Sequence, residues 1–235
     1  MTLDRRRFLA LGSVALVGSA CRDARGGRSA RSFLDLAEAT NEQVERALQH
    51  RAARDLAPAD ARDAGQAFPR YFISREMPVW DPAVRGVWQL EVSGLVKTPL
   101  RLTIDDLTAL PRVTQRVNHY CVEGWTAVAT WAGVRVSDLA RAAGMLPDAQ
   151  YVDFESFDSG YHESWDLESA LHPQTLVAYG MDGALLGPGH GAPARLHSPI
   201  KLGYKSVKYL TRVVFLPTRT GGYWSDQGYE WHAGV

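Results

Sequence analysis

From residue 68 onward the chain is a succession of short segments rich in β-branched and aromatic residues, each bounded by turn residues. Such segments are typical of β-strands. We expect strands at residues 89–92, 100–103, 113–120, 151–157, 175–181, 184–186 and 207–216. The Asp-Gly pair at 182–183 predicts a tight hairpin between two of them. Because the strands do not alternate regularly with helices, the sequence predicts an α+β fold with mixed β-sheets and short helices.

Two of the short helices have recognisable ends. Thr103 and Asp106 have the spacing of a capping box, which predicts a helix that continues until Pro111. Ser137 is a typical cap residue for a second helix, and Gly144 is a typical residue to close it.

The charge balance narrows the classes of partner. The 235 residues include 26 Lys and Arg and 26 Asp and Glu. Removing residues 1–20, with three arginines and one aspartate, leaves 23 basic and 25 acidic residues and a net charge of −2. Without an excess of positive charge we expect no nucleic-acid partner. The two cysteines, Cys21 and Cys121, exclude a disulfide-built scaffold and a multi-cysteine metal site.

The N-terminus has the pattern of an export signal. Arg5, Arg6 and Arg7 precede Phe8, and an apolar run then continues to residue 20. This run is shorter than the roughly 20 apolar residues that a transmembrane helix needs. An arginine pair before a weakly hydrophobic run predicts a twin-arginine signal, with the twin-arginine export machinery as a partner and the periplasm as the location. A general secretory signal is the alternative.

Cys21 directly follows this run, where a bacterial lipoprotein carries its acylated cysteine. Lipidation at Cys21 would anchor the protein to a membrane, and cleavage after residue 20 without lipidation is the alternative. Apolar residues then recur at partly helical spacing up to about residue 51. We therefore expect an export signal over residues 1–21, a linker with an amphipathic helix over 22–67, and one main domain over 68–235.

Cys121 is the only thiol after the signal, and it follows the strand predicted at 113–120. A thiolate can ligate a redox metal or attack as a nucleophile, whereas a buried cysteine can simply fill space. A cysteine hydrolase would need an orienting histidine, and His119 is too near in sequence to serve simply. His190 and His197 could ligate zinc, but no third ligand stands at metal spacing.

The residues around Cys121 belong to an ordered set of blocks. Cys121 begins Cys-Val-Glu-Gly-Trp, and Trp-Ala-Gly-Val follows at 131–134. The other blocks are Val-Trp-Gln-Leu-Glu-Val-Ser-Gly at 87–94, Leu-His-Pro-Gln-Thr-Leu at 171–176, His-Gly-Ala-Pro-Ala-Arg-Leu at 190–196 and Leu-Gly-Tyr-Lys-Ser-Val-Lys at 202–208. Their order resembles the cofactor domain of the sulfite oxidase superfamily of molybdenum enzymes. More narrowly, residues 68–235 are similar to the exported branch that includes the catalytic subunit of periplasmic methionine sulfoxide reductase.

The resemblance implies a cofactor of one molybdenum and one pyranopterin, with Cys121 as the protein's thiolate ligand to the metal. Arg195 and Lys208 would hold the phosphate of the cofactor, because a guanidinium fork and an ammonium group suit phosphate oxygens. Ser206 and Val207 would contribute backbone N–H groups. The other positions that the resemblance assigns to cofactor binding are Ser156, His190 and, in the loop at 71–78, Arg75.

Two positions depart from the relatives. Sulfite oxidases place arginines close after the metal-binding cysteine, whereas Glu123 stands there in this chain. A carboxylate beside the site would repel sulfite, which disfavours sulfite oxidation. Glu123 could tune protons near the metal, as a catalytic group, or only hydrogen-bond to backbone. His190 stands where the reductase branch has Asn. The chain ends soon after the last block, so we expect no immunoglobulin-like C-terminal domain.

The resemblance implies oxygen-atom transfer on a small-molecule substrate of the S- or N-oxide type. The sequence holds no Cys-x-x-Cys-His haem motif, so electrons would be exchanged with a separate membrane subunit that carries haem or is linked to quinone. The alternative is a non-catalytic envelope binding module that retains the fold. Cys121, Arg195 and a signal for folded export favour the enzyme. The aromatic stretch at 221–231 is expected to pack at the chain end rather than to line a substrate entrance.

Overall fold

The computed structural model describes residues 36–44 and 68–235. Residues 36–44 form a helix within the first of two separate units of the chain. The predicted export signal at 1–21, with Cys21, and the rest of the predicted segment at 22–67 lie outside the described residues. Within the described residues, no helix combines the length and the apolar character that crossing a bilayer requires.

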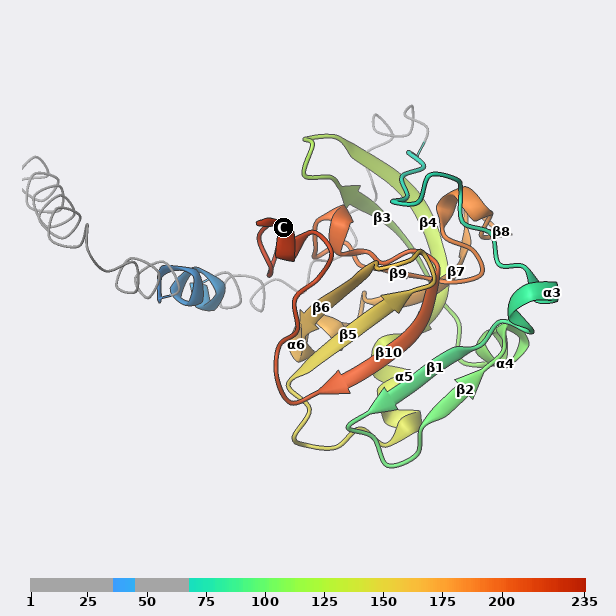
Figure 1. The fold of residues 1–235 in the computed structure, drawn as a ribbon, viewed down its shortest axis with the longest axis horizontal. Helices are drawn as coiled ribbons and strands as arrows, with labels where there is room; N and C mark the ends of the chain where they lie inside the picture. Colours follow the sequence, from blue (N-terminus) through green and yellow to red (C-terminus); the bar gives the residue numbers. More distant parts are fainter. Residues whose placement is uncertain (1–35, 45–67) are drawn as a thin grey trace, which may run out of the picture. The chain divides into compact units, whose positions relative to one another are not determined.

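Residues 68–235 are built on two β-sheets (Figure 1). The first sheet has the strand order β2-β1-β10-β5-β6. Its strands are β1 (Leu90–Gly94), β2 (Leu100–Leu102), β5 (Tyr151–Ser156), β6 (His162–Asp166) and β10 (Leu210–Leu216). β1 runs parallel to β10, with Val92 opposite Val213, whereas the other neighbours are antiparallel. The sheet is therefore mixed, as predicted.

The second sheet has the order β3-β4-β7-β8, and β9 also pairs with β7. Its strands are β3 (Val113–Tyr120), β4 (Thr126–Arg135), β7 (Leu176–Met181), β8 (Ala184–Leu185) and β9 (Arg195–His197). β3 and β4 form a long hairpin whose last pair is Tyr120 with Thr126, so residues 121–125 lie at its tip. The β7–β8 turn is the predicted Asp-Gly pair, with φ of 50° at Asp182 and 86° at Gly183.

The helices are short. They are α3 (Pro82–Arg85), α4 (Ile104–Ala109), α5 (Val136–Ala143) and α6 (Leu167–Ala170), with 3₁₀ turns η2 (Pro188–His190), η3 (Gly203–Lys205) and η4 (Ser225–Gln227). The capping box before α4 is confirmed, because the Thr103 and Asp106 side chains each accept a hydrogen bond from the other's backbone N–H. The cap predicted at Ser137 is wrong: β4 runs directly into α5, so Arg135 takes the cap position.

One predicted strand begins at the wrong residue, and two strands were not predicted. The last strand begins at Leu210 and not at 207, because Tyr209 has a φ of 56°, which interrupts the extended backbone. β4 was not predicted, since its second half is buried on both faces and shows no alternation of apolar and polar residues. β6 was not predicted because its buried positions include Glu163, Ser164 and Asp166, which are polar.

Two apolar clusters hold these elements. The larger joins the first sheet to α5 and includes Leu90, Val92, Leu139, Ala140, Val152, Phe154, Val213 and Phe215. The smaller lies on the second sheet around Trp131, with Val117, Ala129 and Ala178. Since the apolar residues of the strands are used in these clusters, polar side chains of functional interest are found mainly at strand ends and in loops. The α+β class predicted from the sequence is confirmed.

Gly133→Ala is expected to destabilise the fold. β4 and β7 approach so closely at this position that an added methyl group would meet the backbone of Val177 and Ala178. Overpacking of this kind costs about 1–3 kcal/mol, which thermal unfolding detects as a lower Tm. Gly187→Ala is the control, because nothing lies within 4 Å of its methyl position and its φ is −83°. Equal Tm values for the two variants would contradict the pairing of β4 with β7.

Candidate active site

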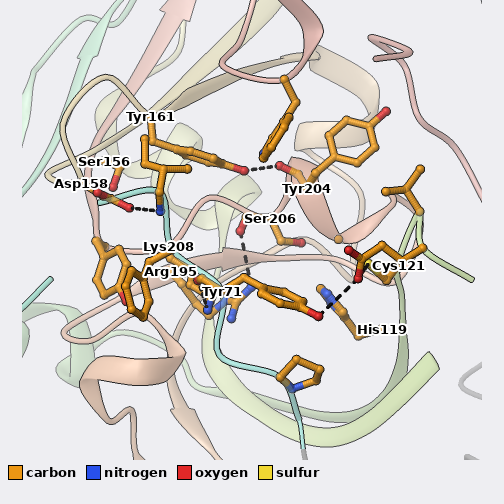
Figure 2. Close-up of a pocket in the computed structure, with 18 of the residues that line it drawn as sticks. Tyr71, His119, Cys121, Ser156, Asp158, Tyr161, Arg195, Tyr204, Ser206 and Lys208 are labelled. Atoms are coloured by element: carbon orange, nitrogen blue, oxygen red, sulfur yellow. Dashed lines mark hydrogen bonds between the residues drawn. The ribbon is translucent and has the colours of Figure 1, made fainter. Parts of the chain in front are cut away.

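A cavity of about 350 Å³ lies where the tip of the β3–β4 hairpin meets the end of β5, β9 and the loop before β10 (Figure 2). Its walls come from residues within 68–73, 119–125, 156–161, 203–209 and 224–229 and from Arg195. Of the site residues predicted from the sequence, the walls contain Cys121, Glu123, Ser156, Arg195, Ser206 and Lys208. The fold therefore gathers these six residues, from Cys121 to Lys208, into one cavity.

Cys121 occupies the first position of the hairpin tip. Its N–H donates to the Trp125 carbonyl at 3.0 Å, and its own carbonyl accepts from the Gly124 N–H at 3.0 Å. Gly124 has a φ of 87°, a conformation that favours glycine, so the tight turn depends on this residue. The thiol is half-buried, and partial burial followed by the Glu123 carboxylate raises its pKa. A cation beside the sulfur would reverse that shift and favour the thiolate.

Glu123 is held by side chains rather than by backbone groups. Its Oε2 accepts from the Trp125 indole N–H at 2.9 Å and from the Tyr71 hydroxyl at 3.3 Å, and it lies 3.9 Å from the Cys121 sulfur. The carboxylate also raises the pKa of the Tyr71 phenol. Of the two alternatives that the sequence left open, the structure favours a carboxylate poised beside Cys121.

Arg195, on β9, is a buried cation with an exposed fraction of only 1%. Its guanidinium donates to the carbonyls of His190 at 3.1 Å and Ser206 at 3.4 Å and stacks over Trp131, with 4.9 Å to the ring centroid. Within the described part of the chain, no carboxylate forms an ion pair with it. Burial lowers its pKa to about 10, so it stays charged at neutral pH.

Lys208 presents a second cation to the same cavity. Its Nζ donates to the carbonyls of Tyr71 at 2.6 Å and Gly189 at 3.0 Å. Burial, followed by the nearby Arg195 charge, lowers the pKa of Lys208 to about 7. Within the described residues both cations hydrogen-bond only to neutral carbonyls, and Asp158, a wall carboxylate whose charge acts on Lys208, forms no ion pair with either. Two cations against this one carboxylate leave an excess of positive charge at this end of the cavity. Such a site suits a ligand with at least one negative charge, such as a phosphate group.

Ser206 and Asp158 complete this end of the cavity. The Ser206 N–H, which was predicted to serve the cofactor, donates instead to the Gly203 carbonyl at 3.0 Å. The Ser206 hydroxyl is buried and has no hydrogen-bond partner among the described residues, so the hydroxyl is available to a ligand. The Asp158 carboxylate accepts from the Ile73 N–H at 3.0 Å and from the Ser74 hydroxyl, which ties the segment at 68–74 across the cavity. Ser156 lines the wall, and its hydroxyl accepts the Asp158 N–H at 2.9 Å.

His119 is a wall residue that sequence reasoning dismissed. It is 5% exposed, and its ring stacks between Trp125, at a centroid distance of 6.0 Å, and His197, at 5.5 Å. Burial, followed by the charges of Arg195 and Lys208, lowers its pKa to about 3, which keeps the imidazole neutral. The position could have been found from β3, where alternate residues Gln115, Val117 and His119 face inward.

Three predicted residues lie outside the cavity walls. Arg75 is exposed. The ring of His190 packs against Phe68, with 5.8 Å between centroids, and the residue reaches the site through its carbonyl on Arg195. Val207 is fully buried, and its carbonyl accepts the Leu196 N–H at 2.7 Å. None of these three side chains lines the cavity.

Aromatic side chains form most of the remaining wall. They include Tyr71, Phe72, Trp125, Tyr161, Tyr204, Tyr209, Trp224 and Tyr229. The prediction that the stretch at 221–231 only packs at the chain end is therefore wrong for Trp224 and Tyr229. The two rings also pack on each other, with 5.0 Å between centroids. The same pair of rings therefore packs near the chain end and lines the cavity.

The model of a protein family described as oxidoreductase molybdopterin binding domain matches residues 76–224. The chain belongs to this family. Its membership confirms the predicted resemblance to the sulfite oxidase superfamily and the predicted oxidoreductase class.

Several relatives of the molybdopterin-binding family are similar to this chain. A protein of Azospira oryzae, provisionally named protein-methionine-sulfoxide reductase subunit YedZ1, is 41% identical over 183 residues, covering 74% of this chain and 70% of that protein. The catalytic subunit MsrP of the protein-methionine-sulfoxide reductase of Ralstonia nicotianae is 32% identical over 59% of this chain and 46% of its own length. The chain spans about half the length of the MsrP relatives.

A solved structure is also similar. The sulfane dehydrogenase SoxCD from Paracoccus pantotrophus has a TM-score of 0.53 at 26% identity, covering 56% of this chain and 38% of that chain. The similarity supports the assignment of the α+β molybdopterin-binding fold.

The residues of the cavity fit a molybdenum cofactor. A thiol, which is a soft metal ligand, lies at one end in Cys121. At the other end, Arg195 and Lys208 form no ion pair and the buried Ser206 hydroxyl has no hydrogen-bond partner, as far as the described residues go. A molecule with a metal at one end and a phosphate at the other would satisfy both groups.

Lys208→Met is expected to raise the Tm of the cofactor-free protein at about pH 6, and to raise it less at about pH 10. The pKa of Lys208 is about 7 in the folded chain against an ordinary 10.5, so the unfolded chain holds this proton more tightly. The resulting cost to folding is fully present below pH 7 and is relieved as the pH rises from 7 to 10.5.

A pH series of thermal unfolding measures this difference. Lys97→Met, at an exposed lysine, controls for the loss of one charge. If the Tm difference between the Lys208 variant and the wild type did not change with pH, the Lys208 ammonium would not be desolvated in the folded chain.

Proposed function

We propose that this protein is an exported molybdenum oxidoreductase that binds one molybdenum and one pyranopterin and transfers an oxygen atom to or from a small S- or N-oxide type substrate. The observation that carries the proposal is a single cavity with the Cys121 thiol at one end and, at the other, the Arg195 and Lys208 cations, neither of which forms an ion pair within the described residues. The names of the relatives favour S-oxide reduction as the direction.

Within this proposal, Cys121 ligates the metal and Arg195, Lys208 and the Ser206 hydroxyl hold the phosphate. Ser156 lines the wall beside Asp158. The bound cofactor would supply two-electron redox chemistry coupled to oxygen-atom exchange. His190 acts through the carbonyl that orients Arg195, whereas Val207 has no contact with the cavity. Arg75 is exposed, and nothing in the geometry assigns it a contact.

The wall around Cys121 favours a neutral substrate over an oxyanion. Glu123 places a carboxylate 3.9 Å from the sulfur, which repels sulfite. Tyr71 and Trp125 both donate to that carboxylate and present aromatic faces to the cavity. A sulfoxide group on an apolar carrier matches this wall, because its carbon atoms can pack on the rings. Its reduction takes two electrons and two protons and releases the sulfide and water.

The proposal includes an external electron donor and an extracytoplasmic location. The sequence holds no covalent haem motif, so electrons would come from a membrane subunit that carries haem or is linked to quinone. The twin-arginine pattern at Arg5 and Arg6 supports export to the periplasm, and Cys21 is the position at which a lipid anchor would attach.

Cys121→Ala is expected to reduce turnover to background and to leave the fold intact, because the side chain is half-buried at a hairpin tip. The test measures molybdenum and pterin content of the exported protein, its electron paramagnetic resonance signal, and dye oxidation with a panel of S- and N-oxides. Cys21→Ala, which removes the other cysteine, is the matched control and should retain both metal and activity. Wild-type protein without stoichiometric molybdenum would overturn the proposal.

Lysine substitution of both Arg5 and Arg6 is expected to hold the precursor in the cytoplasm, because twin-arginine recognition discriminates between the two cations. Cell fractionation measures the location. Arg7→Lys, next to the pair, is the control and should be exported normally. Export of the double variant at the wild-type level would instead identify a general secretory signal.

A further inference from the structure

A second pair of charged residues, Glu163 and Lys205, lies behind the cavity wall. Unlike Arg195 and Lys208, the two carry opposite charges and neutralise each other in an ion pair. Glu163 on β6 and Lys205 in η3 both have an exposed fraction of 0%, and their Oε2 and Nζ atoms lie 2.6 Å apart. The Lys205 ammonium also donates to the Ser164 carbonyl at 3.0 Å and to the Ser225 hydroxyl at 3.4 Å. Every hydrogen of the ammonium therefore has an acceptor.

The Glu163 carboxylate also binds the C-terminal segment. Its Oε1 accepts the Trp224 N–H at 3.1 Å, and its Oε2 accepts the Ser225 hydroxyl at 3.3 Å. Gly222 forms a β-bridge with Glu163 at so short a distance that a side chain at 222 would collide with the carboxylate. One buried carboxylate thus fixes both a residue of η3 and the segment at 222–225.

Both fixed segments carry residues of the cavity wall. Lys205 lies between Tyr204 and Ser206, which line the cavity, and Trp224 lines it as well. The Tyr161 hydroxyl, from the turn before β6, donates to the Tyr204 carbonyl at 2.5 Å, so the same corner is closed from a third side (Figure 2). These segments have little regular secondary structure, and the ion pair supplies an attachment that a strand ladder would otherwise give.

A buried ion pair is a weak source of net stability, because desolvation of the two charges offsets most of their attraction. Its directional hydrogen bonds nevertheless fix the groups around it in one arrangement. We propose that Glu163 and Lys205 are positioning residues that hold the Tyr204–Ser206 wall and the Trp224 wall of the cavity at a fixed separation for the substrate. The inference rests on the proposed function, and it assigns the pair no contact with substrate or cofactor.

The chain contains a matched control on the same strand. Asp166, three residues after Glu163, pairs with the buried Lys201 at 3.3 Å, and Lys201 donates to the His232 carbonyl at 2.7 Å. Asp166 is 3% exposed and also binds the Ser169 N–H at 2.8 Å. None of these partners belongs to the cavity wall. Asp166→Asn therefore disturbs a comparable ion pair without loosening the cavity.

The experiment compares Glu163→Gln with Asp166→Asn in the holoenzyme. Both variants should lose thermal stability, but only Glu163→Gln should raise KM for the S-oxide by about tenfold while kcat changes by less than about twofold, because a misplaced wall weakens substrate positioning. Hydrogen exchange should also become faster at residues 203–206 and 222–225 in Glu163→Gln and stay unchanged there in Asp166→Asn. Equal effects of the two variants on KM and on exchange, or none, would overturn the inference.

Two further measurements cover the cases in which a variant does not fold or the wild type is inactive. If Glu163→Gln does not fold, the double variant Glu163→Leu with Lys205→Met leaves no unpaired charge but still removes the acceptor of the Trp224 N–H, and the same shifts are expected. If the wild type contains no molybdenum and reduces no S- or N-oxide, the proposed function fails. The exchange of residues 203–206 and 222–225 then still decides whether the pair positions the wall.

Discussion

The buried Arg195 and the partly buried Lys208, neither of which forms an ion pair within the described residues, are the constraint around which the cavity is organised. Arg195 and Lys208 are held by the carbonyls of His190, Ser206, Tyr71 and Gly189. Carbonyl dipoles orient a cation but do not cancel its charge, so burial of the pair disfavours the empty folded state. An anion that enters the cavity removes this cost. The protein is therefore built to gain stability from a negatively charged ligand.

The two ends of the proposed cofactor belong to different parts of the fold. Cys121 lies at the tip of the β3–β4 hairpin in the second sheet, whereas Lys208 immediately precedes β10 of the first sheet. Arg195 on β9 pairs with the second sheet through β7. A ligand bound at both ends would connect the two sheets across the loops between them. Cofactor binding and the order of those loops would therefore be coupled.

Much of the fold could be predicted because local rules apply to it. The strand at 113–120, the capping box at Thr103 and the Asp-Gly hairpin each depend on a few neighbouring residues, and all three are confirmed. β6 could not be predicted, because its polar residues are buried by partners far away in the chain. The start of β10 was missed for a related reason, since nothing in the sequence around Tyr209 predicts its positive φ.

In the candidate site, too, some residues could be identified from the sequence, while others depend on contacts between distant segments. Cys121, Arg195 and Lys208 were found because ordered sequence blocks resemble a family, and the structure places them in one cavity. His119 and the aromatic residues of the C-terminal segment were missed or misjudged. Their place in the wall depends on which faces of distant segments meet, and no spacing within the sequence encodes that.

The three lysines at 201, 205 and 208 show how partners decide the role of a residue. All three stand within one segment, and burial lowers the pKa of each. Lys201 and Lys205 form ion pairs with carboxylates of β6, so their charges are neutralised within the protein and their role is structural. Lys208 hydrogen-bonds only to carbonyls and forms no ion pair within the described residues, so its ammonium is available to a ligand. The distinction between a structural and a binding lysine lies in β6, some forty residues earlier, and not in the segment itself.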